Sequence, residues 1–185
     1  AFTPLLIAGC LFVAPVRTAA GAAPAPARDY AVKAVPMTAV KLDGGFWGGR
    51  QAVDIGVTIA HEMKQCEDTK RILNFELAAE ALKGKTGLKH ASPYAFDDSD
   101  VYKVIEAAAY VLMLEPDPGL EKKLDAWIAK IAAAQEPDGY LYTARTINPK
   151  NPPGMSGPER WLNLAHSHEL YCPGHMYEAA VAYHQ

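Results

Sequence analysis

The stretch DDSDVYKVIEAAAYVLMLEPDPGLEKKLDAWIAKIAAAQ, Asp97 to Gln135, decides the fold because it carries two successive helix patterns. In its first half, apolar residues recur at the i, i+3, i+4, i+7 spacing of an amphipathic helix. They are Val101, Val104, Ile105, Ala108, Val111 and Leu112. Asp98 or Ser99 can cap the N-terminus of this helix, and Pro116 is expected to close it.

The second half predicts another helix with clear boundary signals. Asp117 is a natural N-cap, and Pro118 suits the first helical position, where its missing N–H costs no hydrogen bond. One face of this helix is apolar and comprises Leu120, Leu124, Trp127, Ile128 and Ile131. Two helices joined by so short a connection must run roughly antiparallel, so Asp98–Gln135 is predicted to be an αα-hairpin.

Weaker patterns predict helices on both sides of this hairpin. Asp54–Cys66 and Arg71–Leu82 are expected to form a second helical pair. Pro173–Tyr183 is expected to form a later helix, with Pro173 at its first position.

No convincing strand pattern follows residue 50, so the predicted fold class is all-α, built of stacked hairpins over residues 51–185. Upstream, Ala31–Asp43 mixes β-branched residues with turn formers. We therefore predict a short extended N-terminal arm over residues 28–50.

Residues 1–27 are interpreted as a secretory signal peptide. The apolar run PLLIAGCLFVAPV, of about 13 residues, precedes small residues and a fair cleavage site at Ala25–Ala27. The run is shorter than the ~20 residues of a spanning helix, so stable membrane insertion is not expected. We predict a secreted or periplasmic protein, and the stretch IAGC at Ile7–Cys10 keeps lipoprotein anchoring as the less favoured alternative. The printed sequence is expected to begin inside its precursor and to end inside a helix.

The charge balance does not favour a nucleic-acid partner, and none is expected. The sequence has 18 Lys and Arg against 21 Asp and Glu, and removing residues 1–27 deletes only Arg17. The remaining 17 basic and 21 acidic side chains give a net charge of −4. Nucleic-acid-binding domains are usually basic.

The stretch HSHELYCPGHMYEA, His166 to Ala179, is the densest group of reactive side chains. On an unbroken helix His168, Cys172 and His175 would share one face, as metal ligands at i, i+4 do. Pro173 argues against that helix, so the chain is expected to turn near Cys172. Four interpretations stay open: a helix start facing a cleft, satisfied structural residues, a Cys–His nucleophile pair, and a local zinc site.

Carboxylates occur in three further places. FDDSD, Phe96 to Asp100, sets three acids and an aromatic ring at a helix N-terminus, where they could cap the helix or face a sugar. Glu106 and Glu178 lie beside apolar stripes and could each be buried or solvated, and spacing assigns no pair of glycosidase carboxylates.

Two features of the sequence leave alternatives open. The segment between Tyr142 and Trp161, about 18 residues rich in Pro and Gly, either lines a site or is a surface excursion. Cys66 and Cys172 could stay as thiols or form a disulfide.

Several stretches together resemble the N-terminal part of glycoside hydrolase family 127, whose founding activity is β-L-arabinofuranosidase. In chain order they are GGFWGGR (Gly44–Arg50), QCEDTKRILNF (Gln65–Phe75), FDDSDVYKVIEAAAYVL (Phe96–Leu112), AQEPDGYLYT (Ala134–Thr143) and RWLNLAHSHELYCPGHMYEAAVAYHQ (Arg160–Gln185). The resemblance implies a partial (α/α)6 barrel over residues 51–185, cut at its C-terminus, in an exported retaining glycoside hydrolase. The implied substrate is an L-arabinofuranosyl or related plant-glycan residue.

The resemblance also implies where the catalytic machinery lies. The family's cysteine nucleophile, its zinc held by cysteines and a glutamate, and its acid/base glutamate belong to later parts of the family's sequence. No catalytic residue is therefore expected in this chain, which alone should be inactive, and zinc is expected only in the full-length protein. Cys172 matches a cysteine that is not a zinc ligand.

Three residues match positions that line the family's sugar pocket: His168, Phe96 and Gln65. The chain departs from the family pattern at Pro173, where a small residue such as Ala is common, and at Val104, where Trp is common. Both differences bear on local packing. Two alternatives for the function are a non-catalytic α-hairpin scaffold and another (α/α)6 enzyme, such as a polysaccharide lyase or unsaturated glucuronyl hydrolase.

Overall fold

The computed structural model describes residues 32–185. The chain divides into two units, Ala1–Ala34 and Val35–Gln185, and the helices belong to the second. The predicted signal peptide, residues 1–27, lies outside the described residues. Within the described part, every helix is too short or too polar to cross a bilayer.

The second unit consists of helices and connecting segments, without a strand among residues 35–185. In chain order the elements are η1 (Met37–Ala39), α1 (Gly45–Val53), the π-helical turn η2 (Asp54–Thr58), α2 (Ile59–Asp68), α3 (Arg71–Leu82), α4 (Asp98–Leu114), α5 (Pro118–Ala134), α6 (Thr143–Thr146), η3 (Gly154–Ser156), α7 (Leu164–Ser167) and α8 (Tyr171–His184). The all-α prediction is confirmed.

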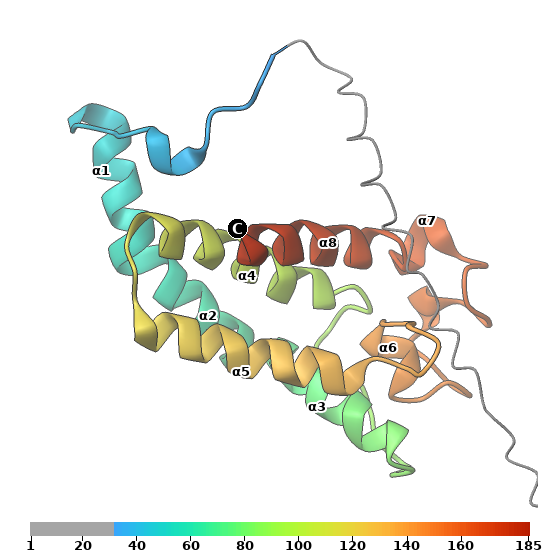
Figure 1. Cartoon of the computed structure of the whole chain (residues 1–185). Helices are drawn as coiled ribbons and strands as arrows, with labels where there is room; N and C mark the ends of the chain where they lie inside the picture. Colours follow the sequence, from blue (N-terminus) through green and yellow to red (C-terminus); the bar gives the residue numbers. More distant parts are fainter. Residues whose placement is uncertain (1–31) are drawn as a thin grey trace, which may run out of the picture. The chain divides into compact units, whose positions relative to one another are not determined.

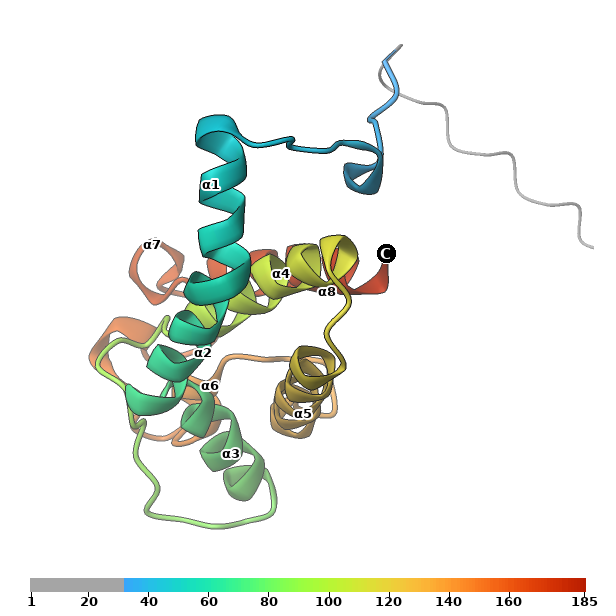
Figure 2. The ribbon, with the colours of Figure 1, turned by 90° about the vertical axis from the view of Figure 1, so that its left-hand side faces the viewer.

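The long helices pack in two layers (Figure 1). α4 makes its most extensive contacts with α8, which runs in the same direction, and α5 makes its own with α3. Figure 2 shows α3 and α5 side by side from a second direction. Helices that are parallel within a layer and antiparallel across layers form the arrangement of an (α/α) barrel, present here in part. The structure confirms that α4 and α5 are joined by a short connection, as the predicted αα-hairpin requires. Each of the two helices nevertheless packs mainly on a helix outside the hairpin, α4 on α8 and α5 on α3.

The N-terminal caps of the hairpin helices differ from each other. The Asp117 side chain accepts hydrogen bonds from the backbone N–H groups of Gly119, at 2.8 Å, and Leu120, at 3.1 Å, so the predicted cap of α5 is confirmed. The predicted cap of α4 by Asp98 or Ser99 is wrong, because the N-cap position is Asp97 and no side chain caps it. The Asp98 carboxylate is turned inward instead.

The predicted arm over residues 28–50 is wrong from Gly45 onward, where α1 begins. The Arg50 guanidinium lies 5.2 Å from the centre of the Phe46 ring, one helical turn before it. This i, i+4 contact stabilises helix in a segment whose glycines favour extended structure. Before it, residues 40–43 are irregular, and Met37–Ala39 forms one 3-10 turn.

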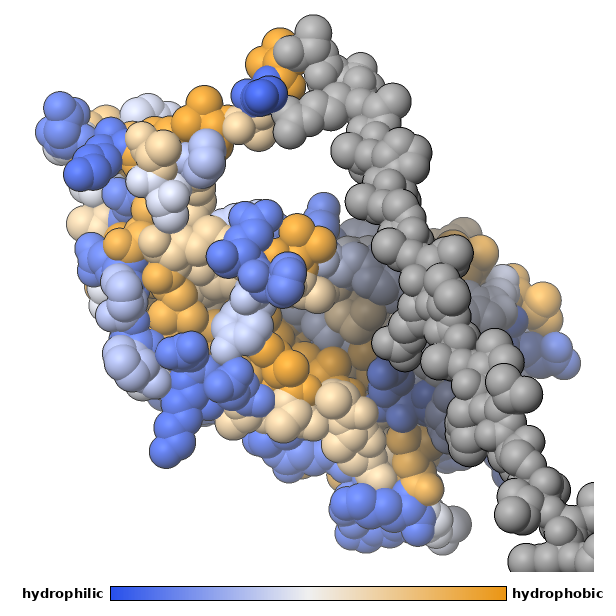
Figure 3. All heavy atoms as spheres, viewed as in Figure 1, coloured by the Kyte–Doolittle hydropathy of each residue, from blue (hydrophilic) through white to orange (hydrophobic). Residues whose placement is uncertain are grey.

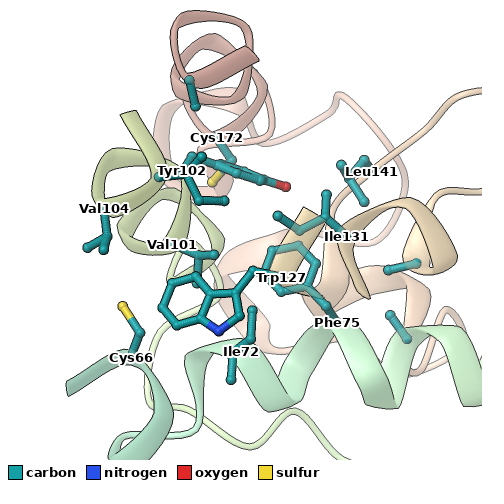
Figure 4. Close-up of a cluster of buried hydrophobic side chains, with 14 of the residues drawn as sticks. Cys66, Ile72, Phe75, Val101, Tyr102, Val104, Trp127, Ile131, Leu141 and Cys172 are labelled. Carbon is teal, nitrogen blue, oxygen red and sulfur yellow. The ribbon is translucent and has the colours of Figure 1, made fainter. Parts of the chain in front are cut away.

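A single apolar cluster joins the layers (Figure 4). The predicted stripes of both hairpin helices enter it: Val101, Val104, Ile105, Ala108 and Val111 from α4, and Leu124, Trp127 and Ile131 from α5. The Phe75 and Tyr102 rings meet edge to face, with centroids 5.8 Å apart. The face in Figure 3 also shows apolar atoms in the hollow between α5 and α8, where Leu112, Met113 and Ala182 line a pocket.

Candidate functional site

The chain turns at His168, four residues earlier than expected. His168 follows α7 with φ 62° and ψ 24°, the left-handed conformation, which costs a residue with a side chain about 1–2 kcal/mol. Its Nδ1 lies 2.8 Å from the carbonyl oxygen of His166. The shared face of His168, Cys172 and His175 therefore does not form, because only the last two lie on α8.

Pro173 is the third residue of α8, so its prediction as the first helical position is wrong. The proline is tolerated there because the first N–H groups of a helix have no intrahelical acceptor. The helix can thus begin at Tyr171 and bring its ring close to the turn.

A row of aromatic rings surrounds His168. The Phe96 and His168 rings have centroids 4.4 Å apart, and Tyr94 stacks on Phe96 at 5.3 Å with parallel planes. On the other side, Tyr171 meets His168 edge to face at 5.4 Å. The structure thus brings together two of the three predicted site residues, from the start of α4 and the turn before α8. Aromatic faces of this kind can pack against the C–H faces of a sugar ring.

Gln65, the third predicted residue, lines an adjoining pocket of about 370 Å³. Its walls also include Arg71, Asp100 and Lys103. The Lys103 Nζ donates to the Tyr171 hydroxyl at 2.8 Å and lies 4.9 Å from the centre of that ring. This pair connects the Gln65 pocket to the aromatic row. Arg71, Lys103 and Tyr171 are site candidates that the sequence did not single out, although all three lie inside family-like stretches.

The three carboxylates of FDDSD have different environments. Asp97 is buried and accepts a hydrogen bond from the backbone N–H of Tyr94 at 3.0 Å. Asp100 is partly exposed toward the Gln65 pocket and accepts from Arg71 Nε at 2.6 Å. Only Asp100 is therefore placed to meet a ligand hydroxyl.

Asp98 is fully buried and ties α4 to α6. Its two carboxylate oxygens accept hydrogen bonds from the Thr143 backbone N–H, at 2.8 Å, and hydroxyl, at 2.6 Å. Burial raises the pKa of Asp98 to about 6, although the hydrogen bonds from Thr143 oppose the rise. Its role is structural, because no face of the carboxyl is open to a ligand.

Cys66 and Cys172 do not form a local zinc centre, which was one of the interpretations that the sequence left open. Such a centre requires several thiolates aimed at one metal ion. Cys66 and Cys172 are buried free thiols at separate edges of the apolar cluster (Figure 4). Burial raises the pKa of both thiols, that of Cys66 to about 12. The Cys172 thiol faces the Phe96 carbonyl oxygen at 3.5 Å, so the interpretation as a Cys–His nucleophile pair is wrong.

Glu106, His175 and Glu178 form a separate cluster where α4 meets α8. Each offers one ligand atom, and these atoms all lie within 4.8 Å of one another. His175 Nδ1 is 3.2 Å from a Glu178 carboxylate oxygen. The set could hold a divalent cation, and in the structure His175 and Glu178 pair with each other along α8, three residues apart. Glu106 is half-buried and Glu178 is exposed.

Residues 148–160 lie mostly at the surface, as one of the two interpretations expected, but Arg145 holds this part of the chain in place. The buried Arg145 guanidinium donates to four successive carbonyl oxygens, at 2.5–3.3 Å, those of Ser156, Gly157, Pro158 and Glu159. Residues 143–147 are themselves buried in and around α6. The segment is therefore a fixed wall of the region around His168 and Glu169.

Glu169 is the buried centre of this wall. Its carboxylate accepts hydrogen bonds from the Tyr140 hydroxyl, at 2.6 Å, the Trp161 backbone N–H, at 3.1 Å, and the Ser167 hydroxyl, at 3.1 Å. Arg145 Nε lies 3.6 Å away and balances the charge. Because Glu169 follows His168 directly, these bonds anchor the turn that presents the His168 ring.

Comparisons of the chain with family models, curated proteins and solved structures all point to the same family. The family model described as β-L-arabinofuranosidase, GH127 catalytic domain, matches residues 39–185. Among curated proteins, a non-reducing end β-L-arabinofuranosidase of Bifidobacterium longum subsp. longum is 49% identical over 90 residues. That match covers 49% of this chain and 13% of the relative.

Two solved enzymes share the fold. A GH127 β-arabinofuranosidase is 47% identical, with a TM-score of 0.76 over 82% of this chain and 23% of its own. A GH127 β-L-arabinofuranosidase from Geobacillus stearothermophilus T6 is 39% identical, with a TM-score of 0.66 over 77% of this chain and 22% of its own. The chain thus spans less than a quarter of each of these relatives.

Proposed function

Because the chain belongs to the GH127 β-L-arabinofuranosidase family, we propose that its protein is an exported retaining glycoside hydrolase acting on L-arabinofuranosyl or related plant-glycan residues. The chain contributes part of the sugar-binding pocket. The named relatives, a β-arabinofuranosidase and two β-L-arabinofuranosidases, support this choice of sugar.

The contact between Phe96 and His168 beside the Gln65 pocket is the observation that carries the proposal. A furanose has C–H faces that pack on aromatic rings and hydroxyls that need polar partners. The aromatic row supplies the first kind of contact. Gln65, Asp100 and Lys103 supply an amide, a carboxylate and an ammonium group for the second.

The described residues bind and orient the sugar, and they are not proposed to break its glycosidic bond. The family resemblance implies that the nucleophile, the acid/base and the zinc ligands belong to later parts of the family's sequence. If zinc is bound elsewhere in the protein, it would hold the nucleophilic thiol deprotonated. The contribution of residues 32–185 is to hold the sugar in one orientation, which lowers the entropic cost of reaching the transition state.

Hydrolysis by the full-length protein tests the activity. We expect release of p-nitrophenol from p-nitrophenyl β-L-arabinofuranoside, little release from the α-L anomer, and a first product with retained configuration by NMR. An inverted first product would rule out the retaining mechanism. No turnover of any arabinofuranoside, with or without added zinc, would favour the scaffold alternative, and an unsaturated uronate product would favour a lyase.

The export proposal rests on residues 1–27 and has its own test. N-terminal sequencing of protein recovered from the culture medium or periplasm should place the first residue near Arg28. Protein that stays in the cytoplasm with residues 1–27 attached would contradict export. A lipid-modified Cys10 would instead establish lipoprotein anchoring.

A further inference from the structure

A second pocket lies on the far side of the turn that carries His168. Its volume is about 340 Å³, enough for one or two sugar rings. Four segments form it: the turn at residues 138–141, the pair Arg160–Trp161, the pair Glu169–Leu170, and the first half of α8. Its lining includes Asp138, Tyr140, Arg160, Trp161, Glu169 and Tyr177.

Arg160 gives this pocket a rigid polar wall. Its two terminal nitrogens donate to Glu136, at 2.5 Å, and to Asp138, at 2.6 Å. Its guanidinium carbon also lies 3.8 Å from the centre of the Tyr140 ring. A guanidinium with three fixed neighbours is already ordered, so binding a ligand would cost little side-chain entropy.

Trp161 presents an aromatic face next to this wall. Its side chain is 46% exposed, and Tyr177 from α8 is 63% exposed. The Trp161 backbone has φ 69°, and its N–H is held by the buried Glu169 carboxylate at 3.1 Å. Tyr140 meets the indole edge to face at 5.3 Å. The indole is therefore held in a partly exposed position by contacts on its backbone and its ring.

We propose that this pocket is a second sugar-binding site, which takes a neutral glycan unit stacked on Trp161. This inference rests on the proposed glycosidase function, because that function supplies the ligand class. The single arginine is already paired with two carboxylates, so an anionic uronate would meet a net negative wall. A neutral sugar would instead use the remaining N–H groups of Arg160 and the exposed Asp138 carboxylate.

The two sites share one backbone segment. His168 faces Phe96 on one side, and Glu169 lies beneath Tyr140 and Trp161 on the other. In the proposed mode of binding, an oligosaccharide places its terminal unit against His168 and a further unit against Trp161, because Glu169, which lines the second pocket, directly follows His168. The second site would act on binding of longer glycans rather than on the bond-breaking step.

Kinetics of the full-length protein carrying Trp161→Ala test the inference. For a neutral arabino-oligosaccharide we expect KM to rise about tenfold or more with kcat nearly unchanged. For p-nitrophenyl β-L-arabinofuranoside, which has no second sugar, KM should not change. Trp161→Phe should recover part of the loss, and Trp47→Ala, which removes another exposed tryptophan on α1, should leave both substrates unaffected.

Three results would overturn the second site. One is an unchanged KM for the oligosaccharide, and another is an equal loss on both substrates, which would indicate a structural role of Trp161. The third is tighter calorimetric binding of an oligogalacturonide than of the neutral oligosaccharide. If the wild type hydrolyses no arabinofuranoside, the proposed function fails, but the second site can still be tested by calorimetry. Binding of the neutral oligosaccharide to the wild type, and loss of that binding in Trp161→Ala, would support the site.

Discussion

Arg145 and Glu169 form a buried ion pair, with 3.6 Å between Nε and Oε1, and each side chain is 6% exposed or less. Arg145 holds four carbonyl groups of the loop that follows it, and Glu169 holds Tyr140, Trp161 and Ser167. The pair thus connects the loop wall to the turn at His168. It is the structural support for both proposed sugar sites.

Loss of Arg145 should be costly because it leaves a buried carboxylate without its cation. Arg145→Met should lower the free energy of unfolding by about 3–5 kcal/mol. Limited proteolysis should then cut within residues 147–160, where the wild type resists. Urea titration and mass spectrometry of the fragments measure the two effects. A double variant with Glu169→Gln should lose less than the sum of the single variants, and simple additivity would show that the pair is not coupled.

His168→Ala should weaken transition-state binding without unfolding the protein. We expect kcat/KM of the full-length protein to fall about ten- to hundredfold, at roughly tenfold per 1.4 kcal/mol. The melting temperature should change little, since the ring is only half-buried. Leu162→Ala, six residues earlier at a position that is 67% exposed, serves as the matched control. Wild-type kcat/KM in His168→Ala would remove this residue from the site.

Asp98 should make stability fall as pH rises. Its pKa is about 6 in the folded protein against 3.8 for an ordinary Asp, so between these values the folded state binds the proton more tightly. The free energy of unfolding should therefore decrease from pH 4 to above pH 6, by on the order of 3 kcal/mol from this group. Asp98→Asn should remove that part of the dependence, as measured by urea titrations across the range. An identical slope in both proteins would contradict the assignment.

The two cysteines should be unreactive in the folded protein. Cys66 and Cys172 are buried, and burial raises the pKa of each thiol, so little thiolate exists at neutral pH. In the absence of a reductant, Ellman's reagent should label Cys66 and Cys172 only after the protein has been denatured. The variants Cys66→Ala and Cys172→Ala show which cysteine gives each labelling signal. Fast labelling of Cys172 in the native protein would restore this residue as a candidate nucleophile.

Local patterns in the sequence were enough to predict the main helices. The apolar spacing and the Asp117–Pro118 pair predicted α4 and α5 nearly to the residue, because caps and stripes act within one helix. The inward position of Asp98 could not be predicted, since its partner Thr143 is 45 residues away. The start of α1 was missed because its three glycines disfavour helix, and the contact between Arg50 and Phe46 becomes visible only once the helix has formed.

The candidate site was predictable only in part for the same reason. Phe96 and His168 were identified from family-like motifs, and the structure places their rings together. The turn at His168 depends on the hydrogen bonds of Glu169 to three residues, two of them earlier in the chain than α7. From the sequence alone, the turn was expected near Pro173, because a proline is a local signal that can be recognised in the sequence. The burial of the Glu169 carboxylate, which holds the turn at His168, cannot be recognised in the same way.

The pairing of α4 with α8 has a consequence for biosynthesis. α4 emerges from the ribosome well before Tyr171–His184, the helix that covers it most extensively. Until then α3, α4 and α5 can associate, but one apolar side of α4 faces water. The nascent chain is thus open to aggregation or chaperone binding during this interval.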